Sequence, residues 1–134
     1  MSDKCFIDTN ILIYVYSGDD LQKRSVATEL FNENAPPLVS VHVLNEFSNV
    51  LLKKGLSCTE ALSAVNELCK FSQVCQTSSK TTKEALRIAE KYRYRFYDSF
   101  HLATALENSC VRFFSEDLQH TQRIQGMSII NPFE

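Results

Sequence analysis

Four acidic residues occupy positions that suit chemistry on a phosphate group. Asp8 directly follows a short apolar run, and Asp117 comes shortly after another. Glu46 lies among apolar residues of a helical pattern, and Asp98 opens a further helical pattern after an aromatic run. Mg²⁺ and Mn²⁺ prefer oxygen ligands, so converging carboxylates are suited to bind one or two such ions. The pattern therefore indicates metal-assisted hydrolysis of a phosphodiester.

Each of these acids also has an ordinary structural interpretation. Asp8 and Asp98 suit helix N-caps, and Asp117 suits a turn. Glu46 suits an ion pair with a buried Arg or Lys. Taken together the four favour a metal site, because carboxylates about 4 Å apart repel by about 4 kcal/mol at an effective dielectric near 20. A bound divalent cation would neutralise that repulsion.

Short apolar runs alternate with helical patterns along the chain. We predict strands at 5–7, 38–40, 73–77, 111–114 and 127–130, and helices from 19 or 20 to 34 and at 41–54, 57–71, 81–92 and 98–108. Capping-box patterns begin two of these helices, Ser57 with Glu60 and Thr81 with Glu84. Residues 11–16 read as apolar chain leading away from the first strand.

This alternation implies βαβ units and a parallel sheet. The predicted fold is α/β, a three-layer α/β/α sandwich with a short-stranded, mostly parallel central sheet, in one domain over residues 1–134. Such folds bind ligands at the carboxyl ends of the strands. All four acids are expected to converge at that edge.

Composition excludes several other classes of protein. The 134 residues carry a net charge of -2, and the 3 glycines are too scattered for a phosphate-binding loop or a dinucleotide fingerprint. No apolar run is long enough for a membrane span, and the residues after Met1 lack a signal-peptide core. The 5 cysteines form no Cys-x-x-Cys pair. We therefore expect reduced thiols in the cytoplasm, no zinc site, and no imidazole cluster that competes with the carboxylates.

Over nearly its whole length the sequence resembles the PIN-domain nucleases, in particular the VapC-like toxins of type II toxin–antitoxin systems. Four segments carry the resemblance in order, and a typical closing segment follows them. They are Asp8-Thr9-Asn10-Ile11-Leu12, Asn45-Glu46-Phe47, Tyr97-Asp98-Ser99-Phe100-His101-Leu102-Ala103, Ser115-Glu116-Asp117-Leu118-Gln119-His120 and Ile130-Asn131-Pro132-Phe133.

The resemblance implies a Mg²⁺- or Mn²⁺-dependent endoribonuclease that forms a homodimer and is inhibited by a cognate antitoxin. The catalytic and metal-binding quartet would be Asp8, Glu46, Asp98 and Asp117. Asn10 and Ser115 match supporting polar positions, and Glu116 leaves the identity of the fourth acid open. Thr121 departs from the family pattern, since many relatives have Gly there, which affects the turn after Asp117 and not the carboxylates.

A basic stretch precedes the third of these segments. Residues 80–95 hold six basic residues against two acidic ones. Arg93 and Arg95 alternate with aromatic residues. Arginine side chains donate hydrogen bonds to phosphate, and aromatic rings stack on unpaired bases. We hypothesise that both arginines border the RNA channel. The alternative is a solvated helix face with core aromatics.

Two other functions stay open at this point. One is a catalytically silent PIN-like module that binds RNA or a protein partner. The other is a phosphatase that acts on small phosphoesters. RNA cleavage with Mg²⁺ or Mn²⁺ that is lost with EDTA distinguishes the nuclease from both.

Overall fold

A computed structural model of the chain describes residues 3–17, 19–34 and 36–134. Met1 and Ser2, on which the expected absence of a signal peptide partly depends, lie outside the described residues, as do Gly18 and Ala35. The helices and strands are, in chain order, β1 (Cys5–Ile7), α1 (Thr9–Ser17), α2 (Leu21–Glu33), β2 (Leu38–Ser40), α3 (Val41–Lys53), α4 (Cys58–Phe71), β3 (Gln73–Cys75), α5 (Ser79–Tyr92), α6 (Phe96–Glu107), β4 (Arg112–Phe114), β5 (Arg123–Ile124) and β6 (Met127–Ile130).

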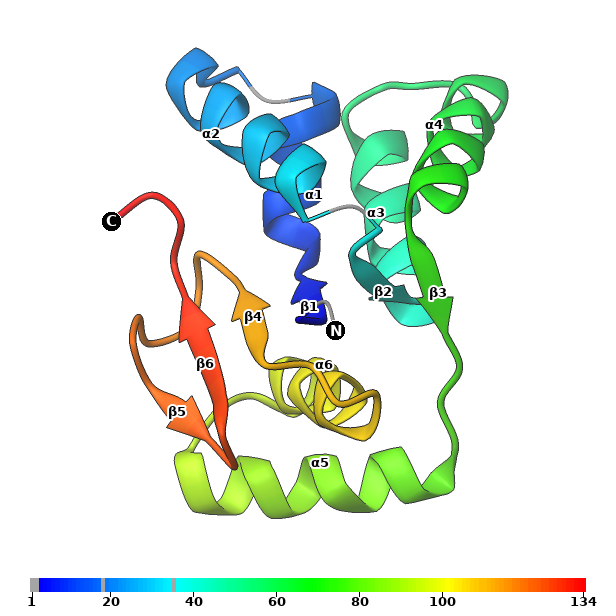
Figure 1. Ribbon diagram of the computed structural model, residues 1–134. Coiled ribbons are helices and arrows are strands. Elements are labelled where there is room, and N and C mark those ends of the chain that lie inside the picture. Colours follow the sequence, from blue (N-terminus) through cyan, green and yellow to red (C-terminus); the bar gives the residue numbers. More distant parts are fainter. Residues whose placement is uncertain (1–2, 18, 35) are drawn as a thin grey trace.

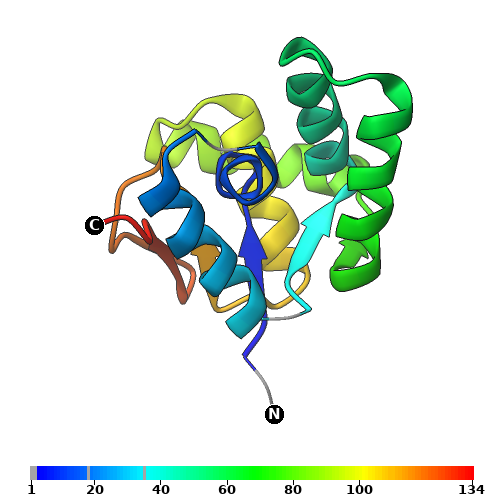
Figure 2. The ribbon, with the colours of Figure 1, turned by 90° about the horizontal axis from the view of Figure 1, so that it is seen from above.

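The predicted three-layer α/β/α sandwich is confirmed. Figure 1 shows the strands across the middle of the molecule, with α1 to α4 above them and α5 and α6 below. Seen from above, α1 lies between α2 on one side and the pair α3 and α4 on the other (Figure 2). The inner strands β1 and β2 are fully buried because helices cover both faces of the sheet.

The central sheet is mostly parallel, as predicted. Within the described residues its order is β3-β2-β1-β4-β6-β5, and β5 alone runs antiparallel to its neighbour. β1 lies at the centre, where Ile7 pairs with Phe114 of β4 and Phe6 pairs with Leu38 of β2. The carboxyl ends of β1, β2 and β4 therefore meet at one edge. This edge carries the residues that follow those strands.

Local sequence explains where several helices begin. The Asp20 side chain caps α2 by accepting from Lys23 N, and the Ser40 hydroxyl caps α3 by accepting from Val43 N. The predicted capping box of Ser57 and Glu60 is present at the start of α4. These bonds satisfy amide groups that have no partner inside the helix.

The predicted capping box of Thr81 with Glu84 is wrong. Helix α5 begins at Ser79, and its box joins the Ser78 side chain to Thr81, which is the third residue of the helix. Thr81 also donates from its hydroxyl to Glu107 of α6, at 2.9 Å. Thr81 is fully buried, whereas Ser78, which caps the helix, is exposed.

The interpretation of residues 11–16 as apolar chain leading away from the first strand missed a helix, since Thr9–Ser17 form α1. The amides of Ile11 and Leu12 both bond to the Asp8 carbonyl, so the helix begins directly after β1. α1 packs against α2 and α3. It therefore lacks the polar face from which a helical pattern is recognised.

The turn that contains Thr121 is strained. Thr121 has φ 70°, a left-handed conformation that a β-branched residue rarely adopts. Many members of the family that the sequence resembles have Gly at this position. Thr121 N bonds to the Ile129 carbonyl at 2.8 Å, which ties the turn to β6. The departure from the family pattern therefore lies in the turn after Asp117.

None of the described helices is both long and apolar enough to pass through a bilayer. All five cysteines are free thiols, and burial raises the pKa of Cys5 to about 11 and of Cys110 to about 12.

Candidate active site

The four acids named from the sequence line one cavity of about 470 Å³ at the carboxyl edge of the sheet. Asp8 follows β1, Asp117 follows β4, Glu46 comes from α3 and Asp98 from α6. The four acidic side chains therefore converge in the structure, as expected. Residues from four separate elements meet here because β1, β2 and β4 are parallel and end together.

Asp8 is the most buried of the four, with 4% of its surface exposed. Its Oδ1 accepts from the amide of Thr9 at 2.7 Å, and its Oδ2 accepts from the Ser115 hydroxyl at 2.9 Å. Burial raises the pKa of Asp8 to about 6, although His101 and the Ser115 hydrogen bond act to lower it. An N-cap side chain accepts from amides of its own helix, so the hydrogen bond from Ser115, which follows the neighbouring strand β4, is not a capping bond.

Glu46 is held by two donors. Its Oε1 accepts from the Thr9 hydroxyl at 2.8 Å and lies 2.8 Å from His101 Nε2. Burial acts to raise the pKa of Glu46, but the bonds from His101 and Thr9 prevail and leave it below its ordinary value. His101 shows the matching change, because Glu46 and Asp8 raise its pKa against the effect of burial. Glu46 thus pairs with a histidine, not with the Arg or Lys of the alternative interpretation.

Asp98 lies in the first turn of α6 and does not cap it. The helix begins at Phe96, and Arg95 occupies the N-cap position without a side-chain capping bond. Burial, followed by the charge of Asp117, raises the pKa of Asp98. This carboxylate is therefore placed by its helix beside other negative charges, without a capping role.

Asn10 and Ser115 connect the carboxylates through hydrogen bonds. Asn10 Nδ2 donates to Asp117 Oδ2 at 2.9 Å, and the amide of Glu116 donates to Asn10 Oδ1 at 3.3 Å. Ser115 is fully buried, and its hydroxyl accepts from the amide of Asp117 at 3.2 Å while donating to Asp8. Together they hold the segment after β4 against the end of β1.

The Glu116 side chain points to a different set of partners. Its Oε1 accepts from the Tyr14 hydroxyl at 2.8 Å, and its Oε2 forms an ion pair with Lys23 of α2. Glu116 does not line the cavity of about 470 Å³, whereas Asp117 does. This geometry favours Asp117 as the fourth acid.

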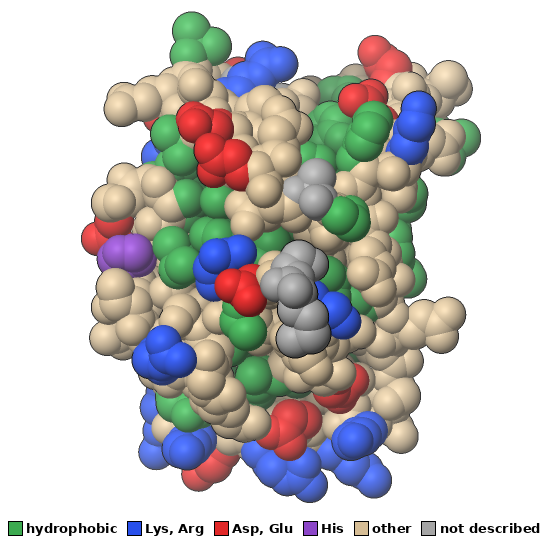
Figure 3. Space-filling model, in the orientation of Figure 1, with side chains coloured by type: hydrophobic (Ala, Val, Ile, Leu, Met, Phe, Trp, Pro, Cys, Tyr) green, Lys and Arg blue, Asp and Glu red, His purple; other side chains and the backbone are tan. Residues whose placement is uncertain are grey.

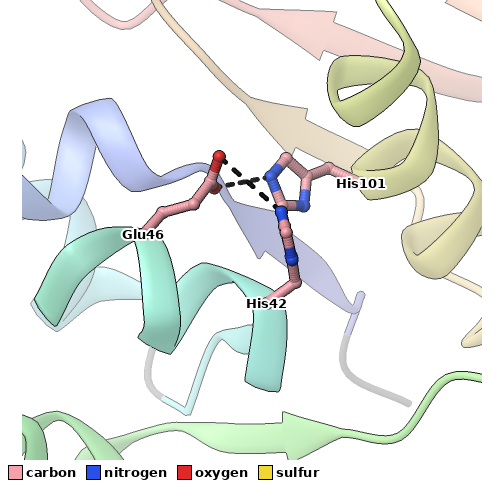
Figure 4. A group of neighbouring side chains, drawn as sticks. All are labelled: His42, Glu46 and His101. Atoms are coloured by element: carbon pink, nitrogen blue, oxygen red, sulfur yellow. Dashed lines mark hydrogen bonds and ion pairs between the residues drawn. The ribbon is translucent and has the colours of Figure 1, made fainter. Parts of the chain in front are cut away.

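Two histidines lie beside Glu46, and the expectation that no imidazole group competes there is wrong. His101 is 1% exposed, and His42 Nε2 lies 3.9 Å from Glu46 Oε2 (Figure 4). Burial lowers the pKa of His42. The sequence held one signal for this contact, because His42 and Glu46 are four residues apart and share a helix face. The approach of His101 from α6 had no such signal.

Arg93 and Arg95 lie on the rim of the same region. Both are exposed, and they line a second cavity of about 700 Å³ whose lining includes Glu46, Asp98 and Asp117. Figure 3 shows further Lys and Arg side chains along the lower edge of the molecule, mixed with acids, where Figure 1 places α5. The exposed basic residues of α5 are Lys80, Lys83, Arg87 and Lys91.

These residues fit a hard divalent cation. The cavity offers carboxylate oxygens, together with the side-chain oxygens of Thr9 and Asn10. Burial raises the pKa of both Asp8 and Asp98, and the charge of Asp117 adds to this effect at Asp98. Oxygen-rich, under-neutralised sites of this kind are what Mg²⁺ and Mn²⁺ bind.

Comparison with known proteins agrees with the fold. Three solved structures are similar to the chain. The first is a toxin–antitoxin complex from Klebsiella pneumoniae, with 19% identity, a TM-score of 0.77, and coverage of 98% of this chain and 99% of the other. The second is VapC20 of Mycobacterium tuberculosis, a sarcin–ricin loop cleaving toxin, with 18% identity, a TM-score of 0.69, and coverage of 82% and 87%.

The third is VapBC2 of Rickettsia felis bound to a promoter DNA fragment, with 16% identity, a TM-score of 0.68, and coverage of 93% and 96%. At these identities the likeness concerns the fold. No curated protein sequence matches the chain. The PIN-domain family model matches residues 5–124, a span that contains every acid of the cavity. The chain therefore belongs to the PIN-domain family.

Proposed function

We propose that the protein is a Mg²⁺- or Mn²⁺-dependent endoribonuclease in one domain over residues 1–134. The observation that carries the proposal is the meeting of four carboxylates from four separate elements in one cavity, bordered by two exposed arginines. Asp8, Glu46, Asp98 and Asp117 would hold the metal. When bound, the ion would activate water and offset charge on the phosphate.

The neighbouring residues have positioning roles in this proposal. Ser115 and Thr9 fix the two oxygens of Asp8, and Asn10 fixes Asp117. Thr9 and His101 hold one oxygen of Glu46. A catalytically silent module is disfavoured because the buried charge of Asp8 destabilises the fold and has no use in a protein that only binds.

The biological role we propose is that of a toxin controlled by a cognate antitoxin, as in the VapBC complex of Rickettsia felis and the complex from Klebsiella pneumoniae. We also propose a homodimer in the cytoplasm. Exposed apolar side chains on α2 and α3, including Leu21, Val41 and Leu52, are available for protein contacts. The free thiols suit a reducing compartment.

Cleavage of an RNA with an exposed loop tests the proposal directly. We expect cleavage with Mg²⁺ or Mn²⁺, none with EDTA, and none of small phosphoesters, because the arginines and open cavity suit a polymer. Asp117→Asn is expected to lower the rate by more than about 100-fold, since it removes a metal ligand. Glu116→Gln is the matched control and should cleave normally, because Glu116 pairs with Lys23. Equal loss in both variants, or cleavage that persists in EDTA, would contradict the assignment.

Reversing the charge of both arginines is expected to weaken RNA cleavage. Arg93→Glu with Arg95→Glu should lower kcat/KM by roughly 10- to 100-fold at low salt, and by less at high salt, because phosphate contacts are lost. Lys80→Glu with Lys83→Glu makes the same change in net charge at the opposite end of α5. If the two double variants behave alike, the arginines act only through overall charge. Unchanged cleavage in the arginine variant would exclude them from the channel.

A further inference from the structure

His42, Glu46 and His101 form a compact group, which we call the imidazole–carboxylate cluster, and Glu46 and His101 also line the cavity of about 470 Å³. One ligand atom from each residue lies within 4.8 Å of the other two. His101 Nε2 is 2.8 Å from Glu46 Oε1, and His42 Nε2 is 3.9 Å from Glu46 Oε2. Figure 4 shows both rings directed at the carboxylate, one from α3 and the other from α6. The cluster therefore joins two helices at one point.

Packing holds both rings in place. His42 stacks on Tyr97 with ring centroids 4.4 Å apart and an interplanar angle of 12°, and Phe100 meets it edge-on at 5.8 Å. His101 is almost fully buried, beside Phe6 at 6.0 Å. Side chains held this way lose little further freedom when they bind an ion. The geometry is thus set before a ligand arrives.

Two nitrogens of the cluster, His42 Nε2 and His101 Nδ1, are buried and have no hydrogen-bond partner among the described residues. Of the two, His42 Nε2 faces Glu46 Oε2, from beyond hydrogen-bond distance. Buried polar atoms are nearly always paired, so an unpaired one that faces a carboxylate points to a ligand.

We propose that the imidazole–carboxylate cluster binds one transition-metal ion, with Zn²⁺ as the reference ion. Two imidazoles and a carboxylate suit Zn²⁺ and its neighbours, whereas Mg²⁺ prefers oxygen ligands alone. Tetrahedral Zn²⁺ with bonds of about 2.0–2.1 Å places its ligand atoms roughly 3.4 Å apart. This spacing lies between the 2.8 Å and 3.9 Å of the present contacts.

Binding at the cluster has a consequence for Glu46, which also belongs to the four acids. The ion would replace the proton shared by His101 Nε2 and Glu46 Oε1, and would hold both oxygens of Glu46 toward the histidines. Glu46 is then withdrawn from the Mg²⁺ site. Zn²⁺ therefore inhibits Mg²⁺-dependent cleavage, a step that rests on the proposed function.

The binding test needs neither RNA nor Mg²⁺. Because Cys58 and Cys69 are exposed and thiolates are zinc ligands, the background is Cys58→Ser with Cys69→Ser. We expect 1:1 binding of Zn²⁺ by calorimetry, and visible absorption bands of a nitrogen-ligated site with Co²⁺. His42→Gln should weaken both at least tenfold. His120→Gln is the matched control, because His120 lies outside the cluster and bonds to Asn131 N. The absence of 1:1 binding, or equal effects of the two variants, overturns the site.

The inhibition test adds RNA and Mg²⁺ to the same proteins. Stoichiometric Zn²⁺ is expected to stop cleavage in the background protein, and His42→Gln should cleave at the normal rate and resist Zn²⁺. Zn²⁺ that binds at His42 and leaves cleavage unchanged would overturn the inhibitory role. If no variant cleaves RNA with Mg²⁺, the proposed function fails, while the calorimetric result for the metal site stands on its own.

Discussion

Asp98→Asn is expected to abolish RNA cleavage and to leave unchanged, or to raise, the melting temperature of the metal-free protein. The substitution keeps the shape of the side chain and removes one of the four negative charges. Cleavage should fall by more than about 100-fold because a metal ligand is lost. Stability should not fall, because burial and the charge of Asp117 already raise the pKa of Asp98 and oppose its ionised form.

The control for this experiment is an aspartate that does cap a helix. Asp20→Ala removes the acceptor for Lys23 N at the start of α2 and should cost about 1 kcal/mol of stability. Its cleavage rate should be normal, since Asp20 does not line the carboxylate cavity. Thermal unfolding in EDTA compares the two variants. A marked loss of stability in Asp98→Asn would identify Asp98 as a structural residue.

The metal-free protein is expected to lose stability as the pH rises through about 6. Asp8 has a folded-state pKa of about 6 against a reference value of 3.8, so the folded state binds this proton more tightly than the unfolded state does. The contribution of Asp8 to the free energy of unfolding is therefore most favourable below pH 4 and disappears above pH 6. Two pKa units correspond to about 3 kcal/mol, or roughly 10 °C in melting temperature for a chain of this size.

The variant Asp8→Asn isolates this effect from other titrating groups such as His101 and Glu46. In EDTA, Asp8→Asn should melt above the wild type at pH 7.5, and the two curves should converge near pH 4. Saturating Mg²⁺ should reverse the order at pH 7.5, because the ion stabilises only a protein that binds it. If the melting temperatures of the two proteins differ by the same amount at every pH from 4 to 7.5, ionised Asp8 does not destabilise the folded state.

Local patterns in the sequence predict most of the fold. The box of Ser57 and Glu60 and the apolar strands are short-range signals, and they appear where expected. Helix α1 was missed because nearly all of its residues face other elements, so it shows no polar face. The two-residue strand β5 was missed because it is defined by pairing with β6 and not by its own composition.

The candidate site was predictable to the extent that it depends on strand ends. Asp8 and Asp117 follow paired parallel strands, so topology alone brings them together. The partners of the carboxylates were not predictable in the same way. His101 reaches Glu46 across 55 positions of sequence, and the pairing of Glu116 with Lys23 spans 93. Contacts of this range leave no periodic pattern in the sequence.

The bonds that connect the end of β1 with the segment after β4 also determine when the site comes into existence. Asn10 and Asp117 are 107 positions apart, as are Asp8 and Ser115. During synthesis, Asp8, Glu46 and Asp98 have all been made before β4 can pair with β1 and bring Asp117 into place. A nascent or truncated chain that stops short of this segment holds three of the acids without the fourth. The full set of four acids therefore exists only after nearly the whole chain has been synthesised.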